Sequence, residues 1–466
     1  MPQKLTKLVA TIGPATETEE IIAKLIDAGM NVARFNTKHS SPEWHQERIR
    51  RVRKVAQEKH ASVAILLDLQ GPEIRINLPQ EKPFDLIEGE TCVFTYNENL
   101  DAVKKVIIPQ NVVESLQVDN MILLDDGACE LKVTAKNSDH LVLTALTNCT
   151  VKHRKTMNVP GVTIDMPSLV SADYAQLDGA QGTDLIDYVG LSFVRDAKDI
   201  EFLRQELDKR GLKSKIISKI ETQAALDNLQ EIVTASDSVM VARGDLGVEM
   251  PYEELVFWQK KIIDLCRAQA KPVITATQML KSMTELPRPT RAEVSDVAHA
   301  IYDGTDAIML SEETTIGKYP VRAVKTQATI AAFNEPYANE NLTIKVTNDP
   351  QEAVINAAIE LTETSGLEVD RLVNLTSTGH SALLAASLHP SRQVIAVTDD
   401  ERVYYALSLA YAVEPVLAPS DIASDANKTI AYLKQQGIIT PGERLIVTHG
   451  IPHRQGGTNT MSIIKA

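Results

Sequence analysis

The stretch SKIISKIETQAALDNLQEIVTASDSVMVARGDLG, residues 214–247, decides the fold class of this chain. Two short apolar runs rich in β-branched residues, 214–220 and 237–242, lie on either side of a stretch with helical character. This alternation is typical of a strand, a helix and a second strand parallel to the first. The stretch therefore predicts one unit of a parallel sheet covered by helices.

The same alternation continues on both sides of this unit. Helical patterns such as 19–28 and 291–302 lie between strand-like runs, and eight such runs occur near residues 6–12, 31–36, 63–69, 186–193, 214–220, 237–242, 272–276 and 306–311. Eight parallel strands, each followed by a helix, are the number that closes a TIM (β/α)8 barrel. The predicted fold class is therefore α/β, with residues 1–70 and 166–340 forming the barrel.

Two further regions are expected outside the barrel. Residues 71–165 predict a small inserted β domain, because short strand-like runs are separated there by polar turns, at 91–96, 106–109, 121–124 and 140–144. Beyond a polar linker, residues 346–466 predict a separate α/β domain. It contains a helical pattern at 351–364 and strand-like runs at 371–375, 393–398 and 444–448.

Composition narrows the class of protein. The 466 residues are 44% hydrophobic and 24% charged, as in soluble globular proteins. A net charge of −14 disfavours nucleic acid and anionic membranes as partners. No apolar run approaches a membrane span, and the start Met1-Pro2-Gln3-Lys4 lacks the apolar core of a signal peptide, so we expect a cytoplasmic protein. Without any Cys-x-x-Cys pair, we expect reduced packing residues at Cys92, Cys129, Cys149 and Cys266.

Charged residues follow the predicted barrel strands, at the end where TIM-barrel active sites lie. Lys219 and Glu221 alternate along one strand and so point to the same side, while Asp245 follows the adjacent strand. Two carboxylates there are suited to hold Mg²⁺ or Mn²⁺, and the lysine adds positive charge for a phosphoryl group or an enolate oxygen. With Gly244 allowing close approach to an anion, and with Arg34, they predict a site for a substrate carrying phosphate and carboxylate. Taken alone, the charged triplet also fits an ion pair at a barrel rim.

Seven blocks of the sequence resemble the pyruvate kinase family. They are TKLVATIGP at 6–14, GMNVAR at 29–34, GPEIR at 71–75, SKIE at 218–221, VARGDLG at 241–247, ATQML at 276–280 and PRPTRAE at 287–293. The resemblance implies a TIM barrel, an inserted small β-barrel lid domain that closes over the site, and a C-terminal α/β domain that is often regulatory. It also implies a homotetramer that transfers phosphate from phosphoenolpyruvate to ADP in glycolysis.

The resemblance also assigns roles to residues. Glu221 and Asp245 would bind the divalent metal, Lys219 would stabilise the phosphoryl group and the enolate, and Arg34 would grip the phosphate. Gly244, Asp245 and Thr277 would contact the substrate. Thr277 and Ser311 would belong to the network that protonates the enolate through water. The positions expected near the nucleotide are Asn36, His39, Arg75 and Lys155.

Three segments depart from the family pattern, and one of them is Leu69-Gln70, where the family commonly has Thr-Lys. In the family, an asparagine, a serine and an aspartate cradle K⁺; Asn36 and Asp68 match, but Lys38 replaces the serine. Because lysine carries its own ammonium, we expect Lys38 to substitute for K⁺ and activity to be independent of K⁺. The alternative is that Lys38 points to solvent and K⁺ still binds. Glu312 stands where the family has glycine, and is expected to alter the pKa of neighbouring groups.

In the C-terminal domain, LTSTGHS at 375–381 follows a strand and precedes a helical stretch. Hydroxyls and backbone N–H groups at a helix N-terminus can cradle a phosphate. The segment resembles the family's effector loop, for a sugar phosphate or nucleotide, through Thr376, Ser377, Thr378 and Ser381. An ordinary Ser/Thr helix cap is the alternative.

Two other functions stay open. One is a Mg²⁺-dependent barrel lyase that forms a different enolate, and the other is a catalytically silent metabolite-binding regulator. The joint presence of Lys219, Glu221, Asp245 and Thr277 argues against a silent protein.

Overall fold

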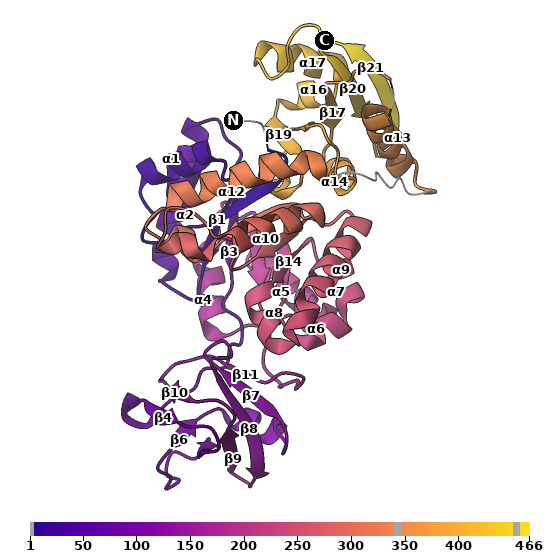
Figure 1. Ribbon diagram of the computed structural model, residues 1–466. Coiled ribbons are helices and arrows are strands. Elements are labelled where there is room, and N and C mark those ends of the chain that lie inside the picture. Colours follow the sequence, from indigo (N-terminus) through magenta and orange to yellow (C-terminus); the bar gives the residue numbers. More distant parts are fainter. Residues whose placement is uncertain (1–3, 339–346, 365, 451–456) are drawn as a thin grey trace.

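The computed structural model describes residues 4–338, 347–364, 366–450 and 457–466, and its centre is a closed barrel of eight parallel strands (Figure 1). This confirms the predicted fold class. In order around the barrel, the strands are β1 (Lys7–Thr11), β16 (Ala307–Leu310), β15 (Val273–Ala276), β14 (Ser238–Ala242), β13 (Lys215–Ile220), β12 (Tyr188–Leu191), β3 (Ala64–Asp68) and β2 (Val32–Asn36).

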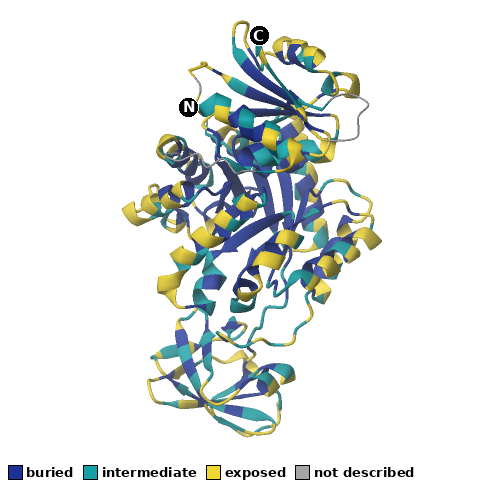
Figure 2. Cartoon of the chain, turned by 90° about the vertical axis from the view of Figure 1, so that its right-hand side faces the viewer, coloured by how far each residue is buried: buried dark blue, intermediate teal, exposed yellow. Residues whose placement is uncertain are grey.

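Helices surround the barrel and bury its strands from outside. They are α1 (Glu19–Ala28), α2 (Pro42–Glu58), α4 (Ser171–Ala180), α5 (Ala197–Lys209), α6 (Gln223–Asp227), α7 (Leu229–Ala235), α8 (Arg243–Glu249), α9 (Leu255–Ala268), α10 (Arg291–Tyr302), α11 (Glu312–Thr315) and α12 (Pro320–Asn334). Figure 2 shows buried strands inside and exposed residues on the outer faces of the helices. Because helices cover one face and side chains fill the interior, the strands read as continuous apolar runs in the sequence. None of the helices in the described part of the chain has the length and apolarity that a membrane crossing needs.

The inserted β domain lies between β3 and β12 and projects from one end of the barrel (Figure 1). A six-stranded sheet in the order β11-β7-β8-β9-β5-β6 and the pair β10-β4 share one apolar core. The elements are β4 (Phe84–Leu86), β5 (Thr91–Thr95), β6 (Lys105–Ile107), α3 (Gln110–Ser115), β7 (Met121–Leu124), β8 (Cys129–Lys136), β9 (His140–Ala145), β10 (Cys149–Val151) and β11 (Met157–Asn158).

The expectation of four reduced cysteines is wrong for one pair in this domain. Cys129 and Cys149 form a disulfide, because β8 and β10 come together in the fold and place their Cα atoms 5.3 Å apart. Spacing along the chain gives no sign of this contact. Cys92 and Cys266 are free and buried, as expected of packing residues.

The C-terminal domain sits on the barrel end opposite the inserted domain (Figure 1). Its sheet has the order β19-β18-β17-β20-β21, with β21 antiparallel and the other strands parallel. The elements are α13 (Pro350–Thr364), β17 (Arg371–Leu375), α14 (His380–Ser387), β18 (Val394–Thr398), α15 (Glu401–Ala406), β19 (Val413–Leu417), α16 (Ser420–Ala423), α17 (Ala426–Gln435), β20 (Arg444–His449) and β21 (Thr460–Lys465). Buried hydrogen bonds join it to the barrel base, such as that from Tyr188 Oη to the carbonyl oxygen of Ala406 at 2.8 Å.

Candidate active site

Lys219 lies at the centre of a buried charge cluster at the barrel mouth. Its Nζ donates to Ser192 Oγ at 2.7 Å and lies 2.7 Å from Glu221 Oε1 and 3.6 Å from Asp68 Oδ1. Strand β13 directs Lys219 and Glu221 to the same side, as predicted for alternate residues. Glu221 is fixed through Oε2, which accepts the backbone N–H of Phe193 at 2.7 Å.

Arg34 extends this cluster toward β1 and β2. Its Nε donates to Asp68 Oδ2 at 2.7 Å, and its Nη1 donates to Thr11 Oγ1 at 2.9 Å. Within the described residues, its Nη2 makes no hydrogen bond. The guanidinium is therefore held rigidly while one nitrogen stays available for an anion.

Opposite charges set the protonation states in the cluster. Burial opposes charge on Lys219, but Asp68, Glu221 and Asp245 outweigh it and raise the pKa of the ammonium. Burial likewise opposes ionisation of Asp68, but Lys219 and Arg34 lower the pKa of that carboxyl. Burial raises the pKa of Glu221, an effect that Lys219 opposes and Asp245 reinforces. Lys219 is thus a permanent cation at neutral pH.

Gly244, Asp245 and Thr277 lie together at the ends of β14 and β15. The backbone N–H of Gly244 donates to Thr277 Oγ1 at 2.8 Å, and a Cβ at Gly244 would lie 3.4 Å from that oxygen. Thr277 has a positive φ of 71°, an uncommon conformation for a β-branched residue. Arg243 helps to hold this turn, since its Nη2 donates to the carbonyl oxygen of Thr277 at 2.7 Å.

Ser311 is positioned by Glu313, a buried residue that the sequence did not single out. Glu313 Oε2 accepts the backbone N–H of Ser311 at 2.8 Å, and Oε1 accepts that of Leu280 at 3.0 Å. One carboxylate therefore links the loops after β15 and β16. Glu312 is exposed and forms an ion pair with Lys281, so its charge has a partner at the surface.

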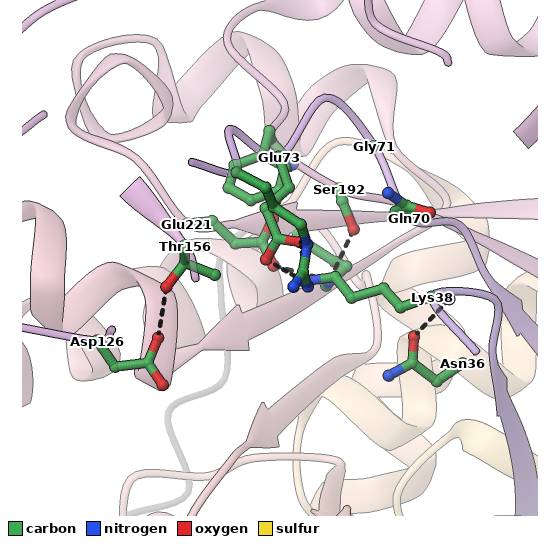
Figure 3. Close-up of polar contacts among 12 residues, drawn as sticks. Asn36, Lys38, Gln70, Gly71, Glu73, Asp126, Thr156, Ser192 and Glu221 are labelled. Atoms are coloured by element: carbon green, nitrogen blue, oxygen red, sulfur yellow. Dashed lines mark hydrogen bonds and ion pairs between the residues drawn. The ribbon is translucent and has the colours of Figure 1, made fainter. Parts of the chain in front are cut away.

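Lys38 points into the site. Its Nζ lies 2.9 Å from Glu73 Oε1, its side chain is 20% exposed, and its charge helps to lower the pKa of Asp68. The ammonium also lies 5.9 Å from the ring centroid of Phe193. Figure 3 shows the Lys38 side chain running toward Glu73 and Glu221.

The four positions expected near the nucleotide fall into two separate pairs. Asn36 and the exposed His39 lie on the barrel, and Asn36 Oδ1 accepts the backbone N–H of Lys38 at 3.2 Å. Arg75 and Lys155 lie on the inserted domain, where Glu73 and Asp125 hold them at 2.7 and 2.8 Å. No hydrogen bond or ion pair joins the two pairs in the described part of the chain.

A cavity of about 160 Å³ separates the barrel mouth from the inserted domain. Asp245 and Phe193 line it from the barrel side, and Glu73, Thr156 and Met157 line it from the inserted domain. The charge cluster is thus next to a space shared by two domains.

Two of the four predicted effector residues stabilise their own loop, and the other two line a cavity. Thr376 Oγ1 accepts the backbone N–H of Gly379 at 2.9 Å, and Ser381 Oγ donates to Asn374 Oδ1 at 2.9 Å, so both hydroxyls stabilise the loop itself. Ser377 and Thr378 instead line a cavity of about 340 Å³ between the barrel and the C-terminal domain.

Comparisons with known proteins agree with this arrangement. The model of the pyruvate kinase barrel domain matches residues 3–324, and that of the pyruvate kinase α/β domain matches residues 352–464. Pyruvate kinases of Staphylococcus aureus strains MRSA252 and COL are each 40% identical over 466 residues, which covers 98% of this chain and 79% of theirs. The crystal structure of a pyruvate kinase from Cryptosporidium parvum has a TM-score of 0.90 and 32% identity, covering 99% of this chain and 96% of that one.

Proposed function

The chain belongs to the pyruvate kinase family and is a phosphotransferase, and from this premise we propose that phosphate passes from phosphoenolpyruvate to ADP at the Lys219 cluster. The single observation that supports this site best is the 2.7 Å pairing of Lys219 with Glu221, buried at the mouth of a closed barrel. Chemistry in TIM barrels takes place at this end.

Lys219 and Arg34 act on the donor. Arg34 Nη2 receives a phosphate oxygen, while the Lys219 ammonium faces the charge that moves between the phosphoryl group and the enolate oxygen. Both groups are already oriented by Asp68, so little reorganisation accompanies the reaction. The inserted domain, taken as residues 71–165, acts as a lid that brings Arg75 and Lys155 toward the nucleotide held near Asn36 and His39, and excludes water.

The residues present suit a divalent metal. Glu221 Oε1 is buried with Lys219 Nζ 2.7 Å away, and Asp245 lies close enough to raise the pKa of Glu221. These two carboxylates would hold Mg²⁺ or Mn²⁺, which neutralises negative charge on the transferring phosphoryl group when bound. Mg²⁺ usually keeps several waters and binds through one or two carboxylates plus substrate phosphates, so substrate and water would supply the other ligands.

Thr277 and Ser311 lie on the loops after β15 and β16, where the enolate must be protonated. Thr277 Oγ1 already donates to the carbonyl oxygen of Ala276 at 2.7 Å, and Glu313 fixes the Ser311 backbone. We assign them to the water network that delivers the proton to the enolate carbon.

A coupled assay with phosphoenolpyruvate, ADP and Mg²⁺ tests this function. ATP and pyruvate in equal amounts support it, pyruvate without ADP indicates a lyase, and binding without turnover indicates a regulator. Lys219→Met should retain the fold and metal binding but lose about 3 kcal/mol or more of transition-state stabilisation. The matched control is Lys209→Met on the exposed face of α5; near-normal turnover by Lys219→Met would remove Lys219 from the mechanism.

We further propose that Lys38 replaces the monovalent cation. The ammonium lies between Glu73 and the Asp68–Glu221 region rather than in solvent, so a positive charge is already built into the place that K⁺ would occupy. Family members depend in general on a divalent metal and on K⁺, and this chain would keep only the first dependence.

Assays in K⁺-free buffer test the role of Lys38. The unmodified enzyme should respond little to added K⁺. Lys38→Ser restores the family hydroxyl and should lose about tenfold in rate without K⁺, then regain it when K⁺ is added. A large stimulation of the unmodified enzyme by K⁺ would refute the proposal.

The cavity beside Ser377 and Thr378 fits a phosphate-bearing effector. Lys213, Lys215 and Arg402 also line it, beside Asp184, Asp187 and Asp400, and Asp400 pairs with Arg402. Titration with a sugar phosphate and with a nucleoside monophosphate, on the unmodified enzyme and on Thr378→Ala, tests this assignment; equal responses contradict it. We also propose a cytoplasmic homotetramer, which sedimentation and cell fractionation test directly.

A further inference from the structure

Asp173 occupies an unusual place at the junction of barrel and lid. The lid is joined to the barrel by an incoming linker at Leu69–Pro72 and an outgoing linker that ends at Val170. Asp173, in the first turn of α4, is fully buried between them. Among the described residues of this first helical turn, Asp173 is the only one that is buried.

The Asp173 carboxylate accepts hydrogen bonds from both linkers. Its Oδ1 accepts the backbone N–H of Gln70 at 2.8 Å, and its Oδ2 accepts that of Gly71 at 3.2 Å. The same Oδ2 accepts the backbone N–H of Val170 at 2.9 Å. The bond to Val170 is an ordinary helix cap, whereas those to the incoming linker join segments about a hundred residues apart.

The incoming linker is also connected to the catalytic lysine. Ser192 Oγ donates to the carbonyl oxygen of Leu69 at 2.8 Å and accepts from Lys219 Nζ at 2.7 Å. A Cβ at Gly71, where φ is +69°, would lie 2.8 Å from Ser192 Cβ, so the linker passes this serine as closely as glycine allows. Figure 3 shows Gln70, Gly71 and Ser192 side by side.

We propose that Asp173 is the positioning residue of the lid hinge, where its single carboxylate fastens both linkers and makes the lid turn as one body about a point beside Ser192 and Lys219. Without this carboxylate the two linkers would move independently, and the lid would no longer place Arg75 and Lys155 at a fixed distance from the Lys219 cluster. The inference rests on the proposed role of the lid.

Hydrogen exchange of the unmodified enzyme gives the first test. Peptides covering residues 69–72 and 169–171 should show the same protection and gain it together when phosphoenolpyruvate and Mg²⁺ are added, because one carboxylate holds both. An incoming linker that exchanges freely while the outgoing linker stays protected would overturn the proposal. This measurement needs neither a variant nor turnover.

Asp173→Asn gives the second test. The asparagine amide replaces one acceptor oxygen with an NH₂ group, so it cannot accept all the backbone N–H groups that Asp173 accepts. Spin labels at Ser138→Cys on the lid and Glu201→Cys on α5 should give a broadened distance distribution in Asp173→Asn. The kcat should fall about tenfold, while the KM for phosphoenolpyruvate, which the barrel binds, changes by less than about twofold.

Asp178→Asn is the matched control, since it lies on the same helix with an exposed carboxylate paired to Arg210, and all three readouts should stay unchanged. An unaltered distance distribution and kcat in Asp173→Asn, with only a lower melting temperature, would reduce Asp173 to a helix cap. If Asp173→Asn does not fold, the exchange experiment decides. Failure of the proposed chemistry would instead appear as near-normal turnover of Lys219→Met, with the lid distances unchanged.

Discussion

The mouth and the base of the barrel both bury aspartates, but in opposite electrostatic settings. At the mouth, Asp68 lies between Lys219 and Arg34, and these cations lower the pKa of its carboxyl despite burial. At the base, Asp306 accepts backbone N–H groups from Val273 at 3.0 Å and Tyr411 at 2.9 Å, and burial raises its pKa to about 6.

This difference separates chemistry from stability. At the mouth, Lys219 and Asp68 favour each other's charged state and Asp245 lines the neighbouring cavity, so charge is available to a substrate that arrives. The Asp306 carboxylate is satisfied by the backbone and joins the barrel to the C-terminal domain through Tyr411. In TIM barrels the mouth serves catalysis and the base serves stability, and substitutions at the two ends should separate these effects.

Glu221→Gln should have the largest effect on turnover. Glutamine keeps the shape and can still accept the N–H of Phe193, but it removes the charge that pairs with Lys219 and suits a metal. We expect kcat to fall by about 10² to 10³, with a small change in melting temperature. Steady-state kinetics and Mn²⁺ binding by electron paramagnetic resonance measure this, with exposed Glu201→Gln as the control. Full activity together with normal Mn²⁺ affinity would place the metal elsewhere.

Asp306→Ala should lower stability and leave turnover nearly unchanged, the reverse of Glu221→Gln. It leaves the N–H groups of Val273 and Tyr411 buried without an acceptor, and each such group costs about 1–3 kcal/mol. The free energy of unfolding should fall by about 3 kcal/mol while kcat/KM changes by less than about twofold. Denaturant unfolding and kinetics on the same samples check this, against exposed Asp208→Ala. A loss of activity without a loss of stability would contradict the separation of the two ends.

The barrel was predictable because its strands are buried on both faces and read as apolar runs. Six of the described strands were missed: β4, β8, β10 and β11 in the inserted domain, and β19 and β21 in the C-terminal domain. In the lid, β8 (Cys129–Lys136) alternates buried and half-exposed residues and contains a register shift between Val133 and Ala135. The edge strand β19 (Val413–Leu417) contains Pro415, which a sheet edge tolerates, and the edge strand β21 (Thr460–Lys465) has no buried residue.

The convergence of Lys219, Glu221 and Asp245 was predictable, but the contacts within the candidate site were not. Barrel topology alone places Lys219, Glu221 and Asp245 at one end, so charged residues after strands were a sufficient signal. The pairing of Lys38 with Glu73 depends on how the loop after β2 meets the incoming lid linker, and no local pattern encodes that meeting. The hydrogen bond between Lys219 and Ser192 was not predictable from a local pattern either, because Ser192 follows β12 whereas Lys219 lies on β13.

The pH dependence of stability sharpens the comparison at the base. A folded pKa of about 6 for Asp306, against 3.8 for the free side chain, means that the folded state binds the proton more tightly. This group therefore contributes stability at low pH that is lost as pH rises toward 6, by about 1 kcal/mol between pH 5 and 7. The asparagine of Asp306→Asn does not titrate. Between pH 5 and 7 the free energy of unfolding of this variant should therefore fall by about 1 kcal/mol less than that of the unmodified enzyme. Denaturant unfolding across this range measures the difference, and parallel curves would contradict it.

Glu312→Gly should have the smallest effect, although it changes a residue next to Ser311. The expectation that its charge alters neighbouring pKa values weakens once Glu312 is seen exposed and paired with Lys281. Exposed ion pairs contribute about 0–1 kcal/mol, and the backbone of Ser311 is held by Glu313 instead. The variant restores the family glycine and should leave both the pH profile of kcat and the melting temperature nearly unchanged. A shifted pH profile would mean that the Glu312 charge reaches the proton-transfer network, and Lys281→Met, which frees that charge, should then shift the profile in the opposite direction.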